Sequence, residues 1–350
     1  MAVTNTFYIK IVFFIGKAMS CICIIAGFFL TFSGCMVAET NNKPIKSLNG
    51  GETGEIHFES SNPYSYNHIL DGADNDENVT VFGILKIPGA TTDKVGAIVF
   101  VHGSGGWRKS YDRWVKTFNK MGIATFRLSC FKPRGISRTV GSQTRVTSSM
   151  MTADAYNALK LLSTHPRIDK DRIGIMGWSK GGAVSMISAW EPVRKAIVNS
   201  NLKFALHIAL YPFCYGFESV QMTGAPILIL VGEKDDWTHA EPCMECAKAL
   251  KDAGYDADII VYPDAYHAFD SYNEVTFLEN ALNMEKCRAI IKSNGLAIEK
   301  TSGFSMDNPE KLQKVWEICA TKGVHYGKND SAKKKSTEDV KRFIKKVFGQ

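Results

Sequence analysis

The chain has 350 residues, 45% of them hydrophobic and 22% charged, and a formal net charge of +7. This length can bury a substantial core, and the sequence contains no low-complexity tract or internal repeat. The positive charge would suit a nucleic-acid-binding protein, but much of the basic excess lies in residues 331–350, where apolar side chains recur at helical spacing. We therefore expect a docked terminal helix with a solvated basic face, and no nucleic acid as partner. The apolar stripe of that helix comprises Val340, Phe343, Ile344, Val347 and Phe348.

The N-terminus has the pattern of an export signal. Lys10 and Lys17 flank apolar residues, and the apolar run after Lys17 is too short to span a bilayer comfortably. Small residues then lead to Cys35 in the sequence Phe-Ser-Gly-Cys, which resembles a bacterial lipobox. We expect a lipoprotein-type signal peptide over residues 1–34 and a lipid anchor on Cys35. Plain secretion and an uncleaved membrane anchor are the alternatives.

Two further regions follow the predicted signal. Residues 35–54 are polar and rich in chain breakers, which predicts a flexible tether, and a single domain follows over residues 55–350. In this domain short apolar runs alternate with helical patterns. Strands are predicted at 79–88, 97–103, 123–128, 172–178, 204–212, 225–232 and 257–263. Helices are predicted at 109–122, 150–166, 181–190 and 240–254. The alternation predicts an α/β domain whose doubly wound, mostly parallel sheet is flanked by helices, with ligands at the carboxyl ends of its strands.

The pentapeptide Gly-Trp-Ser-Lys-Gly at residues 177–181 lies at a predicted strand-to-helix junction. A serine in such a sharp, strained turn needs glycine two positions to either side, because larger side chains would collide with neighbouring backbone. The turn also directs the N-terminus of the following helix at developing negative charge. The sequence predicts Ser179 as a nucleophile, with a glycine-rich packing turn as the alternative.

A serine nucleophile needs a base that a carboxylate orients, and two downstream loops supply both. The loop after the strand at 225–232 contains Asp235 and Asp236, and the loop after the strand at 257–263 contains His267. The order of serine, aspartate and histidine is that of α/β-hydrolases. The choice between the two aspartates stays open, because adjacent residues at a strand end point in opposite directions. Three other histidines are weaker candidates for the base: His165, His207 and His239.

The loop Val-His-Gly-Ser-Gly-Gly-Trp at residues 101–107 follows another buried strand, where hydrolases of this type place a donor for the oxyanion. We expect the backbone N–H groups of Ser104 and Lys180 to form the oxyanion hole, with Gly105 as the alternative to Ser104. A phosphate-binding loop is the competing interpretation, but its spacing is absent. His102 is expected to brace this loop.

Several segments together resemble the dienelactone hydrolase family of α/β-hydrolases. The similarity runs from about residue 75 to the end, and its strongest segments are "VHGSGGW", "FKPRGI", "DAYNALKLLSTHPRIDKDRIGIMGWSKGG", "GEKDDWTHA" and "YPDAYHAFD". The resemblance implies an α/β-hydrolase fold. It also favours Asp235 as the acid, because the family's acid lies three residues after the strand-end glycine, here Gly232. Dienelactone hydrolase proper has a cysteine nucleophile, and the serine at position 179 favours a general esterase.

These observations predict a serine hydrolase that cleaves small-molecule carboxylic esters through an acyl-enzyme on Ser179. His267 is the predicted general base and Asp235 the orienting acid; no metal or organic cofactor is required. The predicted lipid anchor would attach the enzyme to a membrane. A peptidase of the prolyl oligopeptidase type and a non-catalytic surface lipoprotein are the alternatives.

Substrate clues are fewer. The polar loop at residues 129–149 carries four basic side chains, which indicate either a site for a carboxylate-bearing ester or a solvated loop: Lys132, Arg134, Arg138 and Arg145. Three tryptophans adjoin the predicted catalytic segments and form either a substrate pocket or core: Trp107, Trp178 and Trp237. The acidic segment 71–80 indicates a hairpin turn more strongly than a calcium site.

The cysteines of the domain indicate structure more strongly than chemistry. Cys243 and Cys246 form a C-x-x-C in a predicted helix, with no second pair or histidine at zinc-site spacing. Cys287 and Cys319 flank a late insertion and could form a disulfide in an oxidising compartment, a pairing that the sequence leaves open.

Overall fold

The computed structural model describes residues 43–72, 78–89 and 93–349. Its centre is an eight-stranded sheet in the order β1-β2-β4-β3-β5-β6-β8-β9. Only the β1–β2 and β2–β4 pairs are antiparallel, so the sheet is mostly parallel, as predicted. The strands are β1 (Gly54–Ser61), β2 (Asn78–Lys86), β3 (Val95–Val101), β4 (Ala124–Ser129), β5 (Ile168–Trp178), β6 (His207–Leu210), β8 (Ile227–Gly232) and β9 (Ala257–Tyr262).

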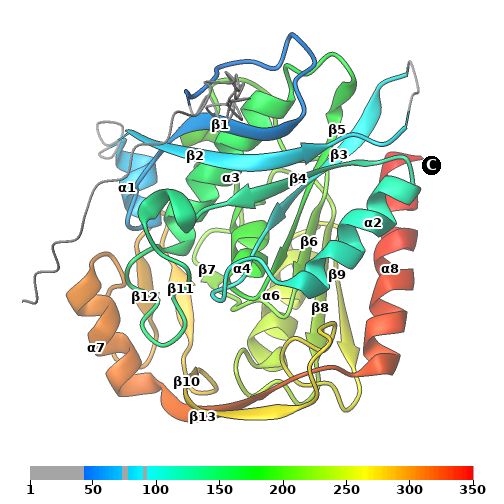
Figure 1. Cartoon of the computed structure of the whole chain (residues 1–350). Coiled ribbons are helices and arrows are strands. Elements are labelled where there is room, and N and C mark those ends of the chain that lie inside the picture. Colours follow the sequence, from blue (N-terminus) through cyan, green and yellow to red (C-terminus); the bar gives the residue numbers. More distant parts are fainter. Residues whose placement is uncertain (1–42, 73–77, 90–92, 350) are drawn as a thin grey trace, which may run out of the picture. The chain divides into compact units, whose positions relative to one another are not determined.

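Helices cover both faces of this sheet. Every residue of β3 is buried, and alternate residues enter different cores because successive side chains point to opposite faces. Ile98 and Phe100 pack with α2 and α8, whereas Val99 packs with the helices of the other face. Figure 1 shows α2 and α8 together on one side. The helices are α1 (Tyr66–Asp71), α2 (Asp112–Lys120), α3 (Ser148–Leu162), α4 (Lys180–Ile187), α5 (Glu191–Ile197), α6 (Ala240–Asp252) and α8 (Asp330–Phe348), with short 3-10 turns η1 (Lys109–Tyr111) and η2 (Lys132–Arg134).

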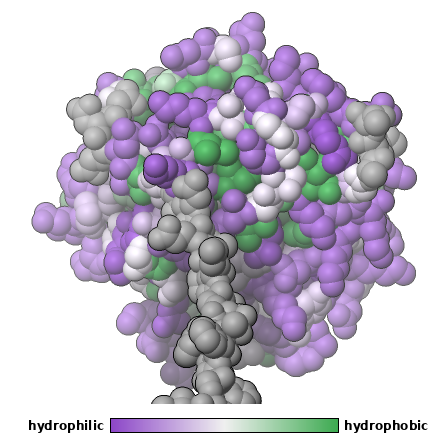
Figure 2. All heavy atoms as spheres, turned by 45° about the horizontal axis from the view of Figure 1, so that its top comes forward, coloured by the Kyte–Doolittle hydropathy of each residue, from purple (hydrophilic) through white to green (hydrophobic). Residues whose placement is uncertain are grey.

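The terminal helix docks through its predicted apolar stripe, of which Val340, Phe343, Ile344 and Phe348 are buried. None of the helices in the described ranges combines the length and the hydrophobicity that a membrane span requires. On the face drawn in Figure 2, hydrophilic residues cover most of the surface and hydrophobic ones form small separate patches.

The segment between β9 and α8 contains structure that the sequence pattern did not predict. We call residues 276–326 the insertion. In it, β10 (Thr276–Asn283) pairs with β13 (Thr321–Tyr326), and β11 (Ala289–Ile291) pairs with β12 (Ala297–Glu299). The insertion also contains α7 (Pro309–Cys319), and β11 pairs with β7 (Gly216–Phe217) of the main domain.

Two disulfides are present among the described residues. Cys287–Cys319 closes the insertion, the pairing that the sequence had left open. The second, Cys214–Cys243, was not predicted; it ties α6 to the chain that follows β6. Cys243 is thus bonded to Cys214, and Cys246 is a free, buried thiol, so the two cysteines of the C-x-x-C are not paired with each other. The described part of the chain contains no group of histidine, cysteine and acidic side chains that could hold a metal ion.

The N-terminal predictions fall largely outside the described residues, which begin at residue 43. The described end of the predicted tether packs against the domain. Leu48 is fully buried, its N–H donates to Thr164 Oγ1 at 2.7 Å, and the N–H of Ile45 donates to His57 O at 2.8 Å. The packed domain therefore begins before the predicted boundary at residue 55. The acidic segment 71–80 also falls mostly outside the described residues.

Candidate active site

Ser179 lies in the turn between β5 and α4, at φ 54° and ψ −117°. A non-glycine residue is strained in this region, and such strain persists only where the surrounding structure enforces it. A Cβ on Gly177 would overlap the carbonyl of Gly181, and one on Gly181 would overlap the carbonyl of Val101. The serine N–H donates to the carbonyl of Leu210 at 2.9 Å, so the neighbouring strand also holds the turn.

The three predicted triad residues meet at this turn. His267 Nε2 lies 3.0 Å from Ser179 Oγ, and His267 Nδ1 lies 2.8 Å from Asp235 Oδ2. Asp235 and His267 are 1% and 4% exposed, whereas Ser179 is partly exposed. The loops after β5, β8 and β9 thus bring a hydroxyl, a carboxylate and an imidazole into one hydrogen-bonded chain.

Local hydrogen bonds orient the buried carboxylate. Asp235 Oδ1 accepts the N–H groups of Trp237 at 3.0 Å and Thr238 at 2.9 Å, which leaves Oδ2 facing His267. Thr238 Oγ1 donates to the carbonyl of Tyr211 at 3.0 Å and lies 3.1 Å from His267 Nδ1. Thr238 had no signal in the sequence, because its contact depends on two other loops.

The neighbouring aspartate faces away. Asp236 Oδ1 accepts the N–H of His325 at 2.8 Å, and its Oδ2 lies 2.7 Å from His325 Nδ1. The choice that the sequence left open is therefore resolved in position: Asp235 contacts His267, and Asp236 contacts the end of the insertion.

The competing histidines have other partners. His207 is fully buried with Nδ1 2.9 Å from the carbonyl of Ser185, and burial lowers its pKa to about 3. His165 Nδ1 accepts the N–H of Arg167 at 3.1 Å, and His239 precedes the first residue of α6. None of the three takes the place of His267.

The loop that carries the predicted oxyanion donor Ser104 is tightly held. The carbonyl of Ser104 accepts the N–H of Thr139 at 2.8 Å, and the hydroxyl of Ser104 donates to Gln143 Oε1 at 3.0 Å. His102 braces the same loop, as expected: Nε2 accepts the N–H of Cys130 at 3.2 Å, so Nδ1 carries the proton and donates to Gly103 O at 3.0 Å. Burial lowers the pKa of His102 to about 4, which keeps the ring neutral.

Lys180, the other predicted donor, is the first residue of α4, where a backbone N–H has no acceptor within the helix. Its side chain was not part of the prediction. The buried amine donates to the carbonyl of Val146 and lies 3.3 Å from Thr139 Oγ1, and burial lowers its pKa to about 7. The side chain thus ties the loop around residues 139–146 to the nucleophile turn.

Two cavities meet at Ser179. Both also border Ser104 and Trp237. The smaller one reaches His267 and Arg108, and the larger one extends toward the insertion. Trp237 is therefore the predicted tryptophan that lines the site, with its ring 4.9 Å from that of His267.

The other two tryptophans do not line these cavities. Trp178 is fully buried and stacks on Tyr111 at 4.1 Å between ring centroids. Trp107 packs under the guanidinium of Arg127, 4.2 Å from the ring centroid. The sequence left open whether Trp178 lines a substrate pocket or packs in the core, and its burial shows that it packs in the core.

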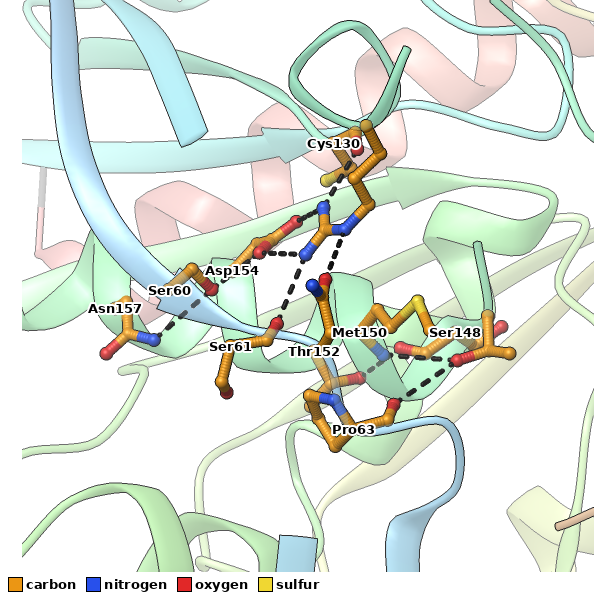
Figure 3. Close-up of polar contacts among 12 residues, drawn as sticks. Ser60, Ser61, Pro63, Cys130, Ser148, Met150, Thr152, Asp154 and Asn157 are labelled. Atoms are coloured by element: carbon orange, nitrogen blue, oxygen red, sulfur yellow. Dashed lines mark hydrogen bonds and ion pairs between the residues drawn. The ribbon is translucent and has the colours of Figure 1, made fainter. Parts of the chain in front are cut away.

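The basic loop contains one buried arginine. Arg134 holds Asp154 through two contacts of 2.7 and 3.0 Å and donates to the carbonyl of Cys130 at 2.8 Å. Ser60 Oγ donates to the same carboxylate at 2.6 Å, and Figure 3 shows these polar contacts around Asp154. Arg134 therefore has a structural role. The other basic residues of the loop, Lys132, Arg138 and Arg145, are exposed.

A buried carboxylate beneath the site was not predicted. Asp270 is fully buried and accepts hydrogen bonds from Trp114 Nε1 at 2.8 Å and Tyr211 Oη at 2.7 Å. Arg113 pairs with it at 3.1 Å. The Tyr211 ring lies 4.7 Å from the ring of His267, so this cluster supports the packing of the base.

A model of the dienelactone hydrolase family matches residues 94–289, more than half of the chain. A Bradyrhizobium protein named "Probable 2-oxo-3-(5-oxofuran-2-ylidene)propanoate lactonase" is 28% identical over 121 residues, which are 34% of this chain and 48% of that protein. A Bacillus subtilis protein named "Uncharacterized peptidase YtmA" is 30% identical over 108 residues, 23% of this chain and 42% of that protein. The chain thus spans less than half of the length of either relative. Among solved structures, the apo form of Thermogutta terrifontis esterase 2 is 19% identical with a TM-score of 0.45; the similarity covers 55% of this chain and 82% of that one.

Proposed function

The chain belongs to the dienelactone hydrolase family, and from that premise we propose that it is a serine hydrolase that cleaves carboxylic esters. The observation that carries the proposal is the unbroken chain of contacts from Ser179 through His267 to Asp235, at 3.0 and 2.8 Å, with the serine in a strained turn. Such an arrangement activates a hydroxyl that is otherwise a weak nucleophile.

The proposed roles follow from the contacts. The carboxylate of Asp235 keeps the imidazole proton on Nδ1, so the Nε2 lone pair faces the hydroxyl of Ser179. His267 takes the proton as the oxygen attacks the ester carbonyl, and the N–H groups of Ser104 and Lys180 stabilise the oxyanion. His267 then protonates the leaving alcohol. Water, activated by the same base, releases the acyl group.

The decisive experiment is Ser179→Ala, assayed with p-nitrophenyl acetate and with a fluorophosphonate that labels reactive serines. The substitution should lower kcat by about 10⁴- to 10⁶-fold, as loss of a triad member does, and should abolish labelling. Ser163→Ala, at the end of α3, is the matched control and should retain both the wild-type kcat and the fluorophosphonate labelling. A wild-type protein that is neither labelled nor active would support the non-catalytic lipoprotein instead.

A peptidase is the second candidate, because one curated relative is named a peptidase and the same three groups can attack an amide. Comparing short peptide p-nitroanilides with the matching p-nitrophenyl esters would separate the two. A kcat/KM for the amides equal to that for the esters would favour the peptidase.

We also propose that the protein is exported and held to a membrane through a lipid on Cys35. Two disulfides in the described residues support an oxidising compartment. Labelled palmitate should be incorporated into the wild-type chain and not into Cys35→Ser. Incorporation into both would refute the anchor.

A further inference from the structure

The larger cavity beside Ser179 has an aromatic wall. Ring centroids are 6.1 Å apart for Tyr66 and Tyr215, 5.1 Å for Tyr215 and Phe213, and 6.3 Å for Phe213 and Trp316. All four rings border the cavity, and all three contacts are edge-to-face. Another aromatic ring would extend this arrangement favourably.

Part of the wall, including one of the four rings, comes from the insertion. Met306, Leu312 and Trp316 border the cavity and lie beyond residue 289, where the match to the family model ends. The insertion is closed by its own disulfide, which holds α7 to the chain before β11. This part of the wall therefore lies beyond the segment that the family model matches.

The cavity also contains buried polar groups without a protein partner. Among the described residues, Ser149 Oγ and Trp316 Nε1 have no hydrogen-bond partner, although the two residues are only 2% and 7% exposed. Both residues border the cavity, as do Tyr64 and Tyr66, whose buried hydroxyls also have no hydrogen-bond partner in the described part of the chain. An indole N–H can only donate, and a hydroxyl can donate, so both atoms would be satisfied by an acceptor on a ligand.

The position of His267 tells which part of an ester enters this cavity. The imidazole must protonate the leaving alcohol, so the alcohol lies on the side of His267. His267 borders the smaller cavity, whereas the larger one borders both predicted oxyanion donors without it. The acyl group therefore points into the larger cavity, and the alcohol into the smaller one.

We propose that this cavity is an acyl pocket for an aromatic acid, whose ring carries an oxygen that accepts hydrogen bonds from Ser149 and Trp316. This inference rests on the proposed ester hydrolysis and names its substrate class: esters of an oxygen-substituted aryl acid with a small alcohol.

The test compares three methyl esters that share one leaving group, followed by titration of the released acid. Methyl 3-(4-methoxyphenyl)propanoate should exceed methyl acetate in kcat/KM by on the order of 10²-fold, because the ring becomes buried. It should exceed methyl 3-(4-ethylphenyl)propanoate, in which a CH₂ group replaces the ether oxygen at nearly the same shape, by about 2- to 10-fold through the new hydrogen bonds.

Two substitutions link these preferences to the pocket. Trp316→Phe keeps a ring and removes the N–H, so it should remove most of the preference for the methoxy ester over the ethyl ester. Leu312→Trp fills the cavity and should lower the ratio of aryl-ester to acetate kcat/KM at least about 10-fold. Ile318→Trp is the matched control, since it adds the same bulk to α7 at a side chain that is 53% exposed, and it should leave the ratio unchanged.

The outcomes separate this inference from the proposed function. Equal kcat/KM for all three esters, or a ratio that Leu312→Trp does not change, would overturn the aryl pocket. Ester hydrolysis that still depends on Ser179 would then leave the proposed function standing. Hydrolysis of no ester, together with no fluorophosphonate labelling, would overturn both.

Discussion

Replacing Asp235 with asparagine should inactivate the enzyme through the wrong tautomer of His267. The N–H groups of Trp237 and Thr238 both point at Oδ1, at 3.0 and 2.9 Å, so the amide oxygen must occupy that position. The amide NH₂ then faces His267 Nδ1 across what is now a 2.8 Å contact. Nδ1 must become an acceptor, which moves the ring proton to Nε2, opposite the hydroxyl of Ser179. A base that already carries the proton cannot accept one, and we expect kcat to fall about 10⁴-fold, as in other triads.

The adjacent aspartate supplies a matched control for the same assay. Asp236→Asn changes a side chain that is 25% exposed and paired with His325, and it should alter kcat by less than about 5-fold. Steady-state hydrolysis of p-nitrophenyl acetate measures both, and circular dichroism checks that each variant folds. Asp235→Asn with more than about a tenth of the wild-type kcat, or an equal loss in Asp236→Asn, would refute the assignment of the acid.

Three further predictions concern stability, each measured by urea unfolding. Burial lowers the pKa of Lys180 from 10.5 to about 7. Between pH 7 and pH 10.5 the unfolded chain therefore binds a proton that the folded chain does not, so the free energy of unfolding falls as the pH decreases. The free energy of unfolding of the wild type, relative to that of Lys180→Met, should rise by about 2–3 kcal/mol between pH 7.5 and 9.5. A difference between the two proteins that does not change with pH would contradict this prediction. Serine at both positions 287 and 319 removes the disulfide and opens a loop with a sequence separation of 32, which should lower the free energy of unfolding by about 3–4 kcal/mol. An unchanged free energy of unfolding would show that the crosslink does not constrain the unfolded chain. Asp270→Asn leaves Arg113 without its buried counter-ion and should cost about 3–5 kcal/mol, whereas a loss below about 1 kcal/mol would show that the cluster relaxes.

The parallel sheet and the three site loops could be predicted because their signals are local. All seven residues of β3 and all six of β8 are buried, so the sequence of each strand is a continuous apolar run. The glycines at positions 177 and 181 are required by backbone contacts that any sharp strand-to-helix turn imposes. Chain order alone then brings the loops after β5, β8 and β9 to one edge of the sheet.

What could not be predicted depends on the detailed geometry of a turn or on partners far away in the chain. The direction of Asp235 is determined by two backbone N–H groups of its own turn, and that of Asp236 by a histidine 89 positions later. The strands of the insertion also lack a clear signal: β11 and β12 have three residues each, and most of β10 is exposed or half-buried. Gln143 and Asp270 are buried polar residues, whose partners a composition pattern does not reveal.

The insertion is joined to the catalytic loops as well as to the proposed acyl pocket. The N–H of Gly327, just after β13, donates to the carbonyl of His267 at 2.9 Å, and Tyr326 forms a parallel bridge with the same residue. His325 meanwhile holds Asp236, the neighbour of the acid. Removing the insertion would therefore displace the base and the acid loop together, and loss of activity after a deletion would say nothing about acyl selectivity. Single substitutions in α7 leave these contacts of β13 intact, so they alone can separate the walls of the pocket from the support of the triad.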